Sequence, residues 1–339
     1  MVGEPAIDGQ EETIEAIPCQ GCLPATCQIL RTRPEPPDET PADYVARVNR
    51  AIDHVVANLD GDLSLATVAR AAHFSPFHFH RVFQSIVGET LGQFVKRQQL
   101  ERALYLMSHA PKRSLTDVAL ACGFASSSDF SRSFKQRFGV PPRAFDLDGF
   151  RQRRRAEFER AHVAPDGTPR FTSLPPGANP DGFQVRLRDL PPRTVAYVRV
   201  LDPFRSLAVV EDAYHHLLEW AEARGFADRQ WLGYMWDEPE IVALSDCRYD
   251  AAIEVDDVRP HGRIGRFQFP AMRVAEVTIA GDIALEVRAL DWLYGTWLPR
   301  SGCEPDDQPA FEAWIGRPFA HGTEHFTIAC QLPVRRSRG

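Results

Sequence analysis

Apolar residues recur every three or four positions from residue 44 onward, at Val45, Val48, Ile52, Val55 and Leu59, with polar residues between them. This spacing places the apolar side chains on one face of a helix. Similar short apolar stripes continue to about residue 159. The pattern therefore predicts that this part of the chain is a set of short amphipathic helices.

Beyond residue 183, apolar and polar residues alternate, as in the runs at residues 193–200 and 272–279. A period of two is typical of half-buried β-strands. Between these runs, residues 206–224 form a long amphipathic stretch that stops at Gly225, a common helix terminator. We therefore predict that the second part of the chain is α+β.

The length and composition of the chain suggest its domain limits. A chain of 339 residues exceeds the usual size of one domain, which is about 100–200 residues. The expected order is a disordered, acidic, proline-rich tail at 1–40, an all-α domain at 41–150, a linker at 151–182 and an α+β domain at 183–335. The linker is inferred from the basic residues at 151–160 and the Pro- and Gly-rich run that follows.

The net charge of -7 is unevenly distributed: residues 1–40 carry -6, residues 41–160 carry +6 and the remainder carries -7. Only the middle segment suits a polyanionic partner. The sequence contains no apolar run of about 18 residues, and its acidic opening differs from a signal peptide. We therefore expect a cytoplasmic protein.

The helical part contains an internal repeat. At offsets of 50 and then 51, Leu65, Val68, Ala69, Ala71, Phe74, Phe79, Arg81, Phe83 and Gly88 match Leu115, Val118, Ala119, Ala121, Phe124, Phe130, Arg132, Phe134 and Gly139. Each copy has a short alanine-rich helix, a tight turn and a second helix that begins at Ser75-Pro76 or Ser126-Ser127, both suitable helix starts. The repeat predicts two helix-turn-helix motifs in tandem.

The second helix of each copy has a polar face that suits contact with double-stranded DNA. Its residue types can bond to base edges and phosphates; they are Phe77, His78, His80, Arg81 and Gln84 in one copy and Ser127, Ser128, Asp129, Ser131, Arg132 and Lys135 in the other. A linking helix at about 92–107 would place both in successive major grooves, about 34 Å apart. The alternative is a helical bundle whose polar faces only meet water.

Residues 44–145 resemble the DNA-binding domain of the AraC/XylS transcription regulators. The resemblance rests on LSLATVARAAHFSPFHFHRVFQSIVGETLGQFVKRQQLERA and SLTDVALACGFASSSDFSRSFKQRFGVPPRAF. It implies that base-facing positions fall on Phe77, His80, Arg81, Ser127, Ser128, Asp129, Ser131 and Arg132. The sequence departs from the family at Pro76 and Phe77, and also at His73, a position where glycine is common. The first motif is therefore expected to favour apolar contact with a thymine methyl or recognition of DNA shape.

The α+β part also repeats itself. Residues 194–198 match 273–277 at an offset of 79, Trp220 and Gly225 match Trp297 and Gly302 at 77, and Gln230, Tyr234 and Trp236 match Gln308, Glu312 and Trp314 at 78. This predicts two β-β-α-β-β halves with a cavity between them. We expect Trp220 and Trp297 to be core residues and Trp236 and Trp314 to be cavity walls.

Residues 183–334 resemble the GyrI-like effector-binding domains, through SDCRYDAAIEV, ALDWLYGTWLPRSGCEPDD and QPAFEAW. The resemblance implies an aromatic pocket with a glutamate at Glu312. A carboxylate among aromatic rings is poorly solvated and favours a lipophilic cation. The expected effector residues are Tyr197, Tyr234, Trp236, Glu276, Trp292, Glu312 and Trp314. Two alternatives stay open: Glu312 pairs with Arg317 or Arg248, and Glu276 is either a second acidic wall or a surface residue.

Chemistry beyond ligand sensing is less well supported. The sequence lacks hydrolase, P-loop and dinucleotide motifs. His321 and His325 could face each other, but no third ligand is apparent, so no cofactor and no metal are expected. Cys19, Cys22 and Cys27 either bind metal or respond to redox, or are reduced thiols in the tail. The alternative functions are a hydrolase in which Glu312 acts with Tyr234 or Tyr197, and a ligand-sequestering protein fused to a DNA-binding module.

Fusion to two DNA readers favours sensing, since hydrolysis would destroy the signal. The sequence thus predicts a non-enzymatic transcription regulator. We expect its partners to be promoter DNA, a small-molecule effector that is lipophilic or cationic, and RNA polymerase.

Overall fold

The computed structural model describes the whole chain except residues 1–40, 164–166, 168–169, 173, 176 and 337–339. The tail expected at 1–40, with Cys19, Cys22 and Cys27, lies outside the described residues. Within the described part, no helix is both long enough and apolar enough to cross a bilayer.

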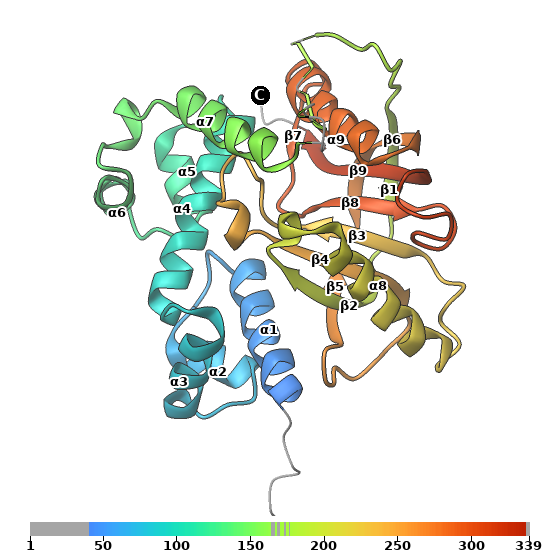
Figure 1. Ribbon diagram of the computed structural model, residues 1–339. Coiled ribbons are helices and arrows are strands. Elements are labelled where there is room, and N and C mark those ends of the chain that lie inside the picture. Colours follow the sequence, from blue (N-terminus) through green and yellow to red (C-terminus); the bar gives the residue numbers. More distant parts are fainter. Residues whose placement is uncertain (1–40, 164–166, 168–169, 173, 176, 337–339) are drawn as a thin grey trace, which may run out of the picture. The chain divides into compact units, whose positions relative to one another are not determined.

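The helical part of the chain runs from residue 41 to residue 161 (Figure 1, blue to green). Its helices are α1 (Pro41–Ala57), α2 (Leu65–Ala71), α3 (Pro76–Val87), α4 (Leu91–His109), α5 (Leu115–Ala121), α6 (Ser127–Phe138), a 3₁₀ turn (Pro142–Ala144) and α7 (Leu147–Ala161). The pairs α2–α3 and α5–α6 are the two predicted helix-turn-helix motifs, and α4 links them.

Local sequence signals set the ends of these helices. The side chains of Ser64, Ser75, Ser114 and Ser126 accept hydrogen bonds from backbone N–H groups in the first turns of α2, α3, α5 and α6. Such caps satisfy donors that have no partner within the helix. Gly88 and Gly139 end α3 and α6 in the left-handed conformation, which glycine adopts without a steric cost.

The turn between the two helices of each motif uses the same unusual backbone conformation. Gly123 has a φ of 77°, and His73, which occupies the corresponding place in the first motif, has a φ of 56°. A side chain at Gly123 would overlap the backbone of Leu59, so glycine is required there for space as well as for conformation. The departure from glycine at His73 therefore leaves the turn intact.

The segment at 151–182 was expected to be a linker, but its first residues complete α7. Phe158 explains the difference, because its ring is buried against Phe171 and Phe204, with ring centroids 5.1 and 5.3 Å away. Arg155 also pairs with Asp291 of α9 (Ile283–Trp292) at 2.8 Å. The basic residues of this segment therefore belong to a packed helix.

In the described residues, the second part of the chain forms one antiparallel sheet of nine strands. Its strands are β1 (Arg186–Leu190), β2 (Arg193–Leu201), β3 (Trp231–Met235), β4 (Arg248–Val255), β5 (Gly265–Phe269), β6 (Met272–Gly281), β7 (Cys303–Pro305), β8 (Ala310–Trp314) and β9 (Phe326–Arg336). Helix α8 (Leu207–Glu222) follows β2, and α9 (Ile283–Trp292) follows β6. The two predicted β-β-α-β-β halves are confirmed.

The two halves exchange strands. The order in the sheet is β1-β6-β9-β8-β3-β4-β2-β5, with β7 paired to β9. The first strand of each half thus pairs with the second strand of the other half, β1 with β6 and β5 with β2. At the centre of the sheet, β3 of the first half pairs with β8 of the second half. Reading outward from this pair, equivalent strands of the two halves follow in the same order on both sides.

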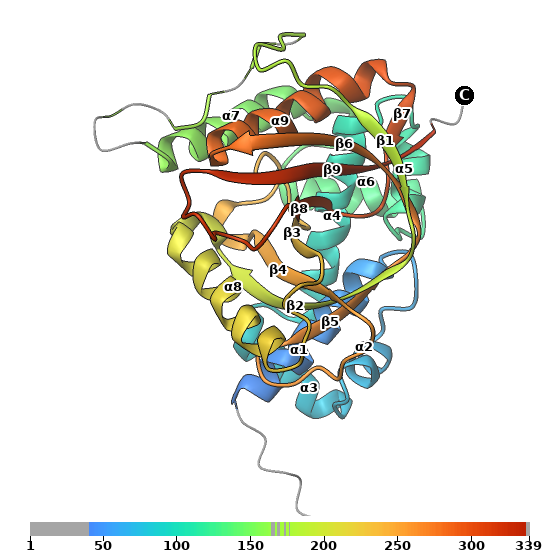
Figure 2. The same cartoon turned by 90° about the vertical axis from the view of Figure 1, so that its right-hand side faces the viewer.

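The two faces of the sheet have different partners. Helices α8 and α9 cover one face, where Val198, Ala251 and Val277 contribute to the core (Figure 2). The opposite face carries a separate apolar cluster around Tyr197, Tyr234 and Phe311. Side chains of α1 and α4 bond to strands on this second face, as described below.

Candidate effector cavity and DNA-reading helices

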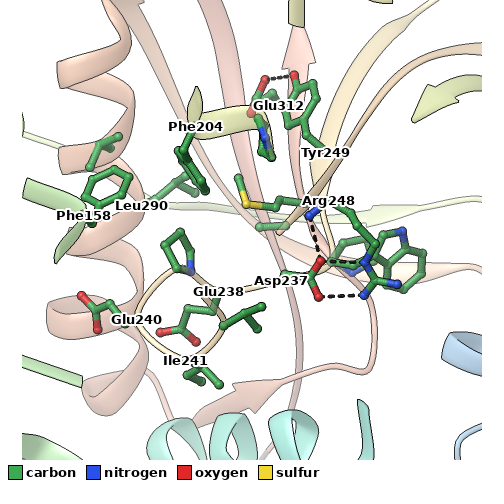
Figure 3. Close-up of a pocket in the computed structure, with 18 of the residues that line it drawn as sticks. Phe158, Phe204, Asp237, Glu238, Glu240, Ile241, Arg248, Tyr249, Leu290 and Glu312 are labelled. Carbon is green, nitrogen blue, oxygen red and sulfur yellow. Dashed lines mark hydrogen bonds and ion pairs between the residues drawn. The ribbon is translucent and has the colours of Figure 1, made fainter. Parts of the chain in front are cut away.

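A cavity of about 1030 Å³ reaches the helix-covered face of the sheet at Trp314 and extends to Trp236 and Phe267, which pack against the apolar cluster of the opposite face. It is lined by residues of α8, α9, β4 and β8, and it extends to α4 and α7 of the helical part. Figure 3 shows its acidic and apolar walls. The aromatic lining residues include Phe158, Phe204, Tyr249, Trp314, Phe319 and Phe326.

Glu312 of β8 lies in this cavity and is held by a chain of hydrogen bonds. Tyr249 Oη donates to Glu312 Oε2 at 2.6 Å (Figure 3). The hydroxyl groups of Tyr249 and Tyr214 are 2.9 Å apart, and Trp314 Nε1 donates to Tyr214 Oη at 2.9 Å. Burial raises the pKa of Glu312 and that of Tyr249. These contacts fix the carboxyl group among aromatic rings.

Gly233 makes room for this arrangement. It lies opposite Glu312 in the pairing of β3 with β8, at the junction of the two halves. A methyl group at Gly233 would overlap both Tyr249 Oη and Glu312 Oε2. A glycine at this position is therefore required by space, and the tyrosine–glutamate contact depends on it.

Glu286 of α9 is a second cavity residue, which the sequence analysis missed. Glu286 is 7% exposed, and its carboxyl group lies beside that of Glu312 in the cavity. Burial raises the pKa of Glu286 well above its usual range, and the neighbouring Glu312 raises it further. One signal was available: Glu286 lies three residues before the buried Ala289, in the apolar stripe of α9.

Several other acidic groups that line the cavity have basic partners. Arg151 Nη2 donates to Glu238 at 3.2 Å and also bonds to Glu240, and Arg155 pairs with Asp291. Neither alternative partner of Glu312 is used: Arg248 Nη2 pairs with Asp237 at 2.7 Å, and Arg317 pairs with Glu222 at 3.0 Å. In the described part of the chain, Glu312 and Glu286 face hydroxyl and carboxyl groups but no guanidinium.

Of the seven expected effector residues, Glu312, Trp314 and Trp236 line the cavity, whereas Tyr197, Tyr234, Glu276 and Trp292 do not. Trp292 packs in the core against Phe183, with ring centroids 5.7 Å apart. Glu276 is buried and accepts hydrogen bonds from Arg188 Nη1 and Gln331 Nε2, at 2.7 and 2.8 Å, so it is neither a cavity wall nor a surface residue.

Tyr234 and Tyr197 belong to the opposite face of the sheet. The sequence alignment matched Tyr234 to Glu312 at an offset of 78, whereas Gly233 is the residue that lies opposite Glu312, on the same face, in the pairing of β3 with β8. A slip of one residue moves every side chain of a strand to the other face. This explains why Tyr234 was wrongly expected in the cavity; Tyr197, aligned with Glu276 at an offset of 79, lies on the opposite face without any slip.

The polar faces of α3 and α6 remain accessible. Phe77 is 78% exposed, and His80, Arg81, Gln84, Ser128, Arg132 and Lys135 are also exposed. The side chains of Ser127, Asp129 and Ser131 are half-buried, and Asp129 pairs with Lys96 at 3.9 Å. His78 is exposed too, but its ring contacts Tyr44 and Phe74, with centroids 5.8 and 5.5 Å away. The buried face of α3 holds Phe79 and Phe83, and that of α6 holds Phe130 and Phe134.

Buried polar contacts join the helical part to the second face of the sheet. Arg199 Nη2 of β2 donates to Asp53 of α1 at 2.8 Å and to Asp250 of β4 at 2.7 Å, and Tyr197 Oη also donates to Asp53. Burial raises the pKa of Asp53, while Arg199 opposes that change. Arg248 Nη2 donates to Gln98 Oε1 of α4 at 2.8 Å.

The segment 236–247 connects the cavity to the second helix-turn-helix motif. Trp236, Glu238 and Ile241 line the cavity. Ile241, Val242 and Cys247 are buried in the same apolar cluster as Val118, Phe130 and Phe134 of α5 and α6. In addition, Glu238 lies 2.9 Å from His109 Nε2 of α4. One short segment thus contacts both the cavity and the core of the second helix-turn-helix motif.

Comparison with known proteins gives two family matches. Residues 68–147 match a helix-turn-helix domain, and residues 183–335 match a GyrI-like small molecule binding domain. The uncharacterized HTH-type transcriptional regulator YbfP of Bacillus subtilis (strain 168) is 30% identical over 102 residues, which are 30% of this chain and 34% of YbfP. The probable transcription factor PqrA of Proteus vulgaris is 32% identical over 87 residues, which are 26% of this chain and 70% of PqrA.

A solved structure, the EcmrR C-terminal domain, matches with 15% identity and a TM-score of 0.35, covering 46% of this chain and 99% of that chain. This chain spans about a third of the length of YbfP, the first of its curated relatives.

Proposed function

We propose that this chain, which belongs to the AraC/XylS-type transcription regulators and carries a GyrI-like small molecule binding domain, regulates transcription in response to a lipophilic cation. The observation that carries the proposal is Glu312, a half-buried carboxyl without a basic partner among the described residues, in an aromatic-lined cavity that reaches the helical part. In this proposal, residues 41–150 form the DNA-binding domain and residues 183–335 form the ligand-binding domain.

For DNA binding, the proposal assigns base contacts to the exposed faces of α3 and α6. Arg81 and Arg132 occupy matching positions in the two copies and suit guanine or phosphate. Phe77, fully presented at the start of α3, suits the methyl group of thymine. His78 is the weakest of the candidates, because its ring packs against Tyr44. Contact with RNA polymerase at the promoter is part of the same proposal.

For ligand binding, the proposal assigns recognition of positive charge to Glu312 and recognition of shape to the rings of Trp314, Phe204 and Tyr249. A cation that displaces water from such a site gains both a charge partner and cation–π contacts. The cavity is large enough for several fused or linked rings. Trp236, the first residue of segment 236–247, lines the cavity as well.

For coupling, the proposal assigns transmission to segment 236–247. A ligand shifts the protein between two states only if it binds them with different affinity. Because this segment lines the cavity and also fills the core beneath α5 and α6, a ligand that moves it changes the packing of the second reader.

We further propose that the chain is not an enzyme. The hydrolase alternative used Tyr234 or Tyr197 beside Glu312, and both tyrosines are on the other face of the sheet. Tyr249 is the hydroxyl that contacts Glu312, so Glu312 with Tyr249 is the pair to test. Turnover of candidate ligands by the purified protein, lost in Glu312→Gln, would favour a hydrolase instead.

The experiment that tests the proposal selects binding sites from random double-stranded DNA and then measures their affinity with and without a ligand. The probe is tetraphenylphosphonium, with tetraphenylborate as a control of the same shape and opposite charge. We expect one preferred site, an affinity that changes with the phosphonium only, and loss of that response in Glu312→Gln. Absence of any preferred site, or equal responses to both probes, would contradict the proposal.

A further inference from the structure

Glu286 and Glu312 bring two carboxyl groups together inside the cavity. They come from different elements, α9 and β8, and both line the cavity wall. The groups that face them from neighbouring elements are Tyr249 of β4, Tyr214 of α8 and Cys330 of β9. Burial raises the pKa of each of these three groups, so all three are neutral near pH 7.

The hydrogen bond from Tyr249 favours Glu312 as the carboxyl group that carries the charge. Two neighbouring carboxyl groups in a buried site hold at least one proton between them, because two like charges there would repel each other at a high cost. Glu312 accepts a hydrogen bond from Tyr249 Oη at 2.6 Å, and this donor favours the ionised form. Glu286 has Glu312 as its only carboxyl neighbour in the described residues, and no hydroxyl donates to it.

We propose that Glu286 determines the charge selectivity of the cavity. It stays protonated and donates a hydrogen bond to Glu312. The cavity then holds one negative charge, which matches a ligand with one positive charge. A dication must either leave one charge unpaired or expel the proton of Glu286, and both cost free energy. This inference rests on the proposed function, since it names the class of cation that the same cavity takes.

The test is isothermal titration calorimetry on the full chain with two rigid biaryl probes of nearly equal size. The monocation is 1-methyl-4-phenylpyridinium, and the dication is 1,1'-dimethyl-4,4'-bipyridinium. Neither probe titrates, so any proton exchanged belongs to the protein. Titrations at pH 7 in two buffers of different ionisation enthalpy give the number of protons released.

We expect the monocation to bind without proton release and the dication to bind about tenfold or more weakly, which corresponds to about 1.4 kcal/mol. The dication is expected to bind more tightly as the pH rises and to release a proton. Glu286→Gln keeps a donor to Glu312, so the affinity for the monocation should persist while proton release by the dication disappears. Glu286→Leu removes the donor and should weaken the monocation, whereas Glu312→Gln should weaken it most.

Three results would overturn the inference. If the monocation releases a proton, Glu286 and Glu312 ionise together on binding. If Glu286→Gln weakens the monocation as much as Glu312→Gln does, Glu286 is a second charge and not a donor; in both cases the proposed cation sensing still stands. If neither biaryl cation nor tetraphenylphosphonium binds, the proposed function fails, and this inference fails with it.

Discussion

Asp53 of α1 and Arg199 of β2 form an ion pair of 2.8 Å that joins the helical part of the chain to the sheet. Both side chains are buried, with 9% and 2% of their surface exposed. Because Asp250 also holds Arg199, the pair is part of a shared network and not an isolated contact.

Asp53→Ala should therefore destabilise the protein. The substitution removes the partner of both Arg199 and Tyr197 from a buried site, and leaving such groups unsatisfied costs about 1–3 kcal/mol. The free energy of unfolding, measured by urea titration with circular dichroism, checks this value. Asp189→Asn provides the control, because the Asp189–Arg273 pair is on the surface and should contribute little. Equal effects of the two substitutions would show that the network does not stabilise the fold.

Arg81→Ala and Arg132→Ala should each weaken binding to the selected DNA site by about 1–3 kcal/mol. Each side chain is exposed on the polar face of a reader helix. Fluorescence anisotropy at several salt concentrations gives both the affinity and the number of phosphate contacts. Arg153→Ala, at an exposed position on α7, is the matched loss of charge. An unchanged footprint and salt slope for both reader variants would exclude α3 and α6 as the DNA-reading elements.

Gly233→Ala should reduce the affinity for tetraphenylphosphonium about tenfold or more, since the added methyl group displaces Tyr249 from Glu312. Gly265→Ala is a demanding control. Its methyl group would overlap the ring of Tyr197, on the other face of the sheet, so it should lower stability without changing the preference for a cation. Calorimetric titration with the phosphonium and the borate separates the two cases. A similar loss of charge preference in both variants would mean that general unfolding is the cause.

The stability gained by Glu286→Gln should depend on pH. Because the pKa of Glu286 is raised in the folded protein, the folded chain holds this proton more tightly than the unfolded chain does. Its burial therefore has no cost below the ordinary glutamate pKa of about 4.3, and it destabilises the protein increasingly as the pH rises above that value. The variant lacks this cost, which is about 1.4 kcal/mol for each unit between the two pKa values.

Thermal unfolding of both proteins between pH 4 and pH 8 measures this difference. The melting temperatures should nearly coincide at pH 4, and the variant should become the more stable protein as the pH increases. Glu222→Gln, at an exposed pair with Arg317, should show no such trend. A difference that stays constant from pH 4 to pH 8 would indicate that the carboxyl of Glu286 is not perturbed by burial.

The sequence was sufficient for the helix-turn-helix motifs because their signals are local. Serine caps, glycine terminators and phenylalanines at helical spacing all lie within one motif, and the structure has helices at these positions. The β-β-α-β-β repeat was likewise predicted, since alternating runs and their order are visible in one sequence. The position of Glu312 in a cavity followed from the family resemblance.

The remainder depends on contacts between distant segments. A strand assigned one residue out of register exposes the wrong face, which is how Tyr234 came to be matched with Glu312. Which face of β2 carries Tyr197 depends on what packs against the sheet. Glu286 was missed because a single glutamate in an apolar helix stripe does not indicate what it will face. The burial of Phe158, which turns a charged segment into a packed helix, depends on Phe204 from another part of the chain.

The apolar side chains that segment 236–247 places beneath α5 and α6 limit how freely this protein can be rearranged by recombination. A helical fragment that ends at residue 150 would retain both helix-turn-helix motifs. It would expose the apolar surface that Ile241, Val242 and Cys247 cover in the full chain. Fusing a foreign sensor domain to this helical part therefore requires apolar side chains of the same volume at this place. The helical part and the sheet part depend on each other's packing and cannot be exchanged independently.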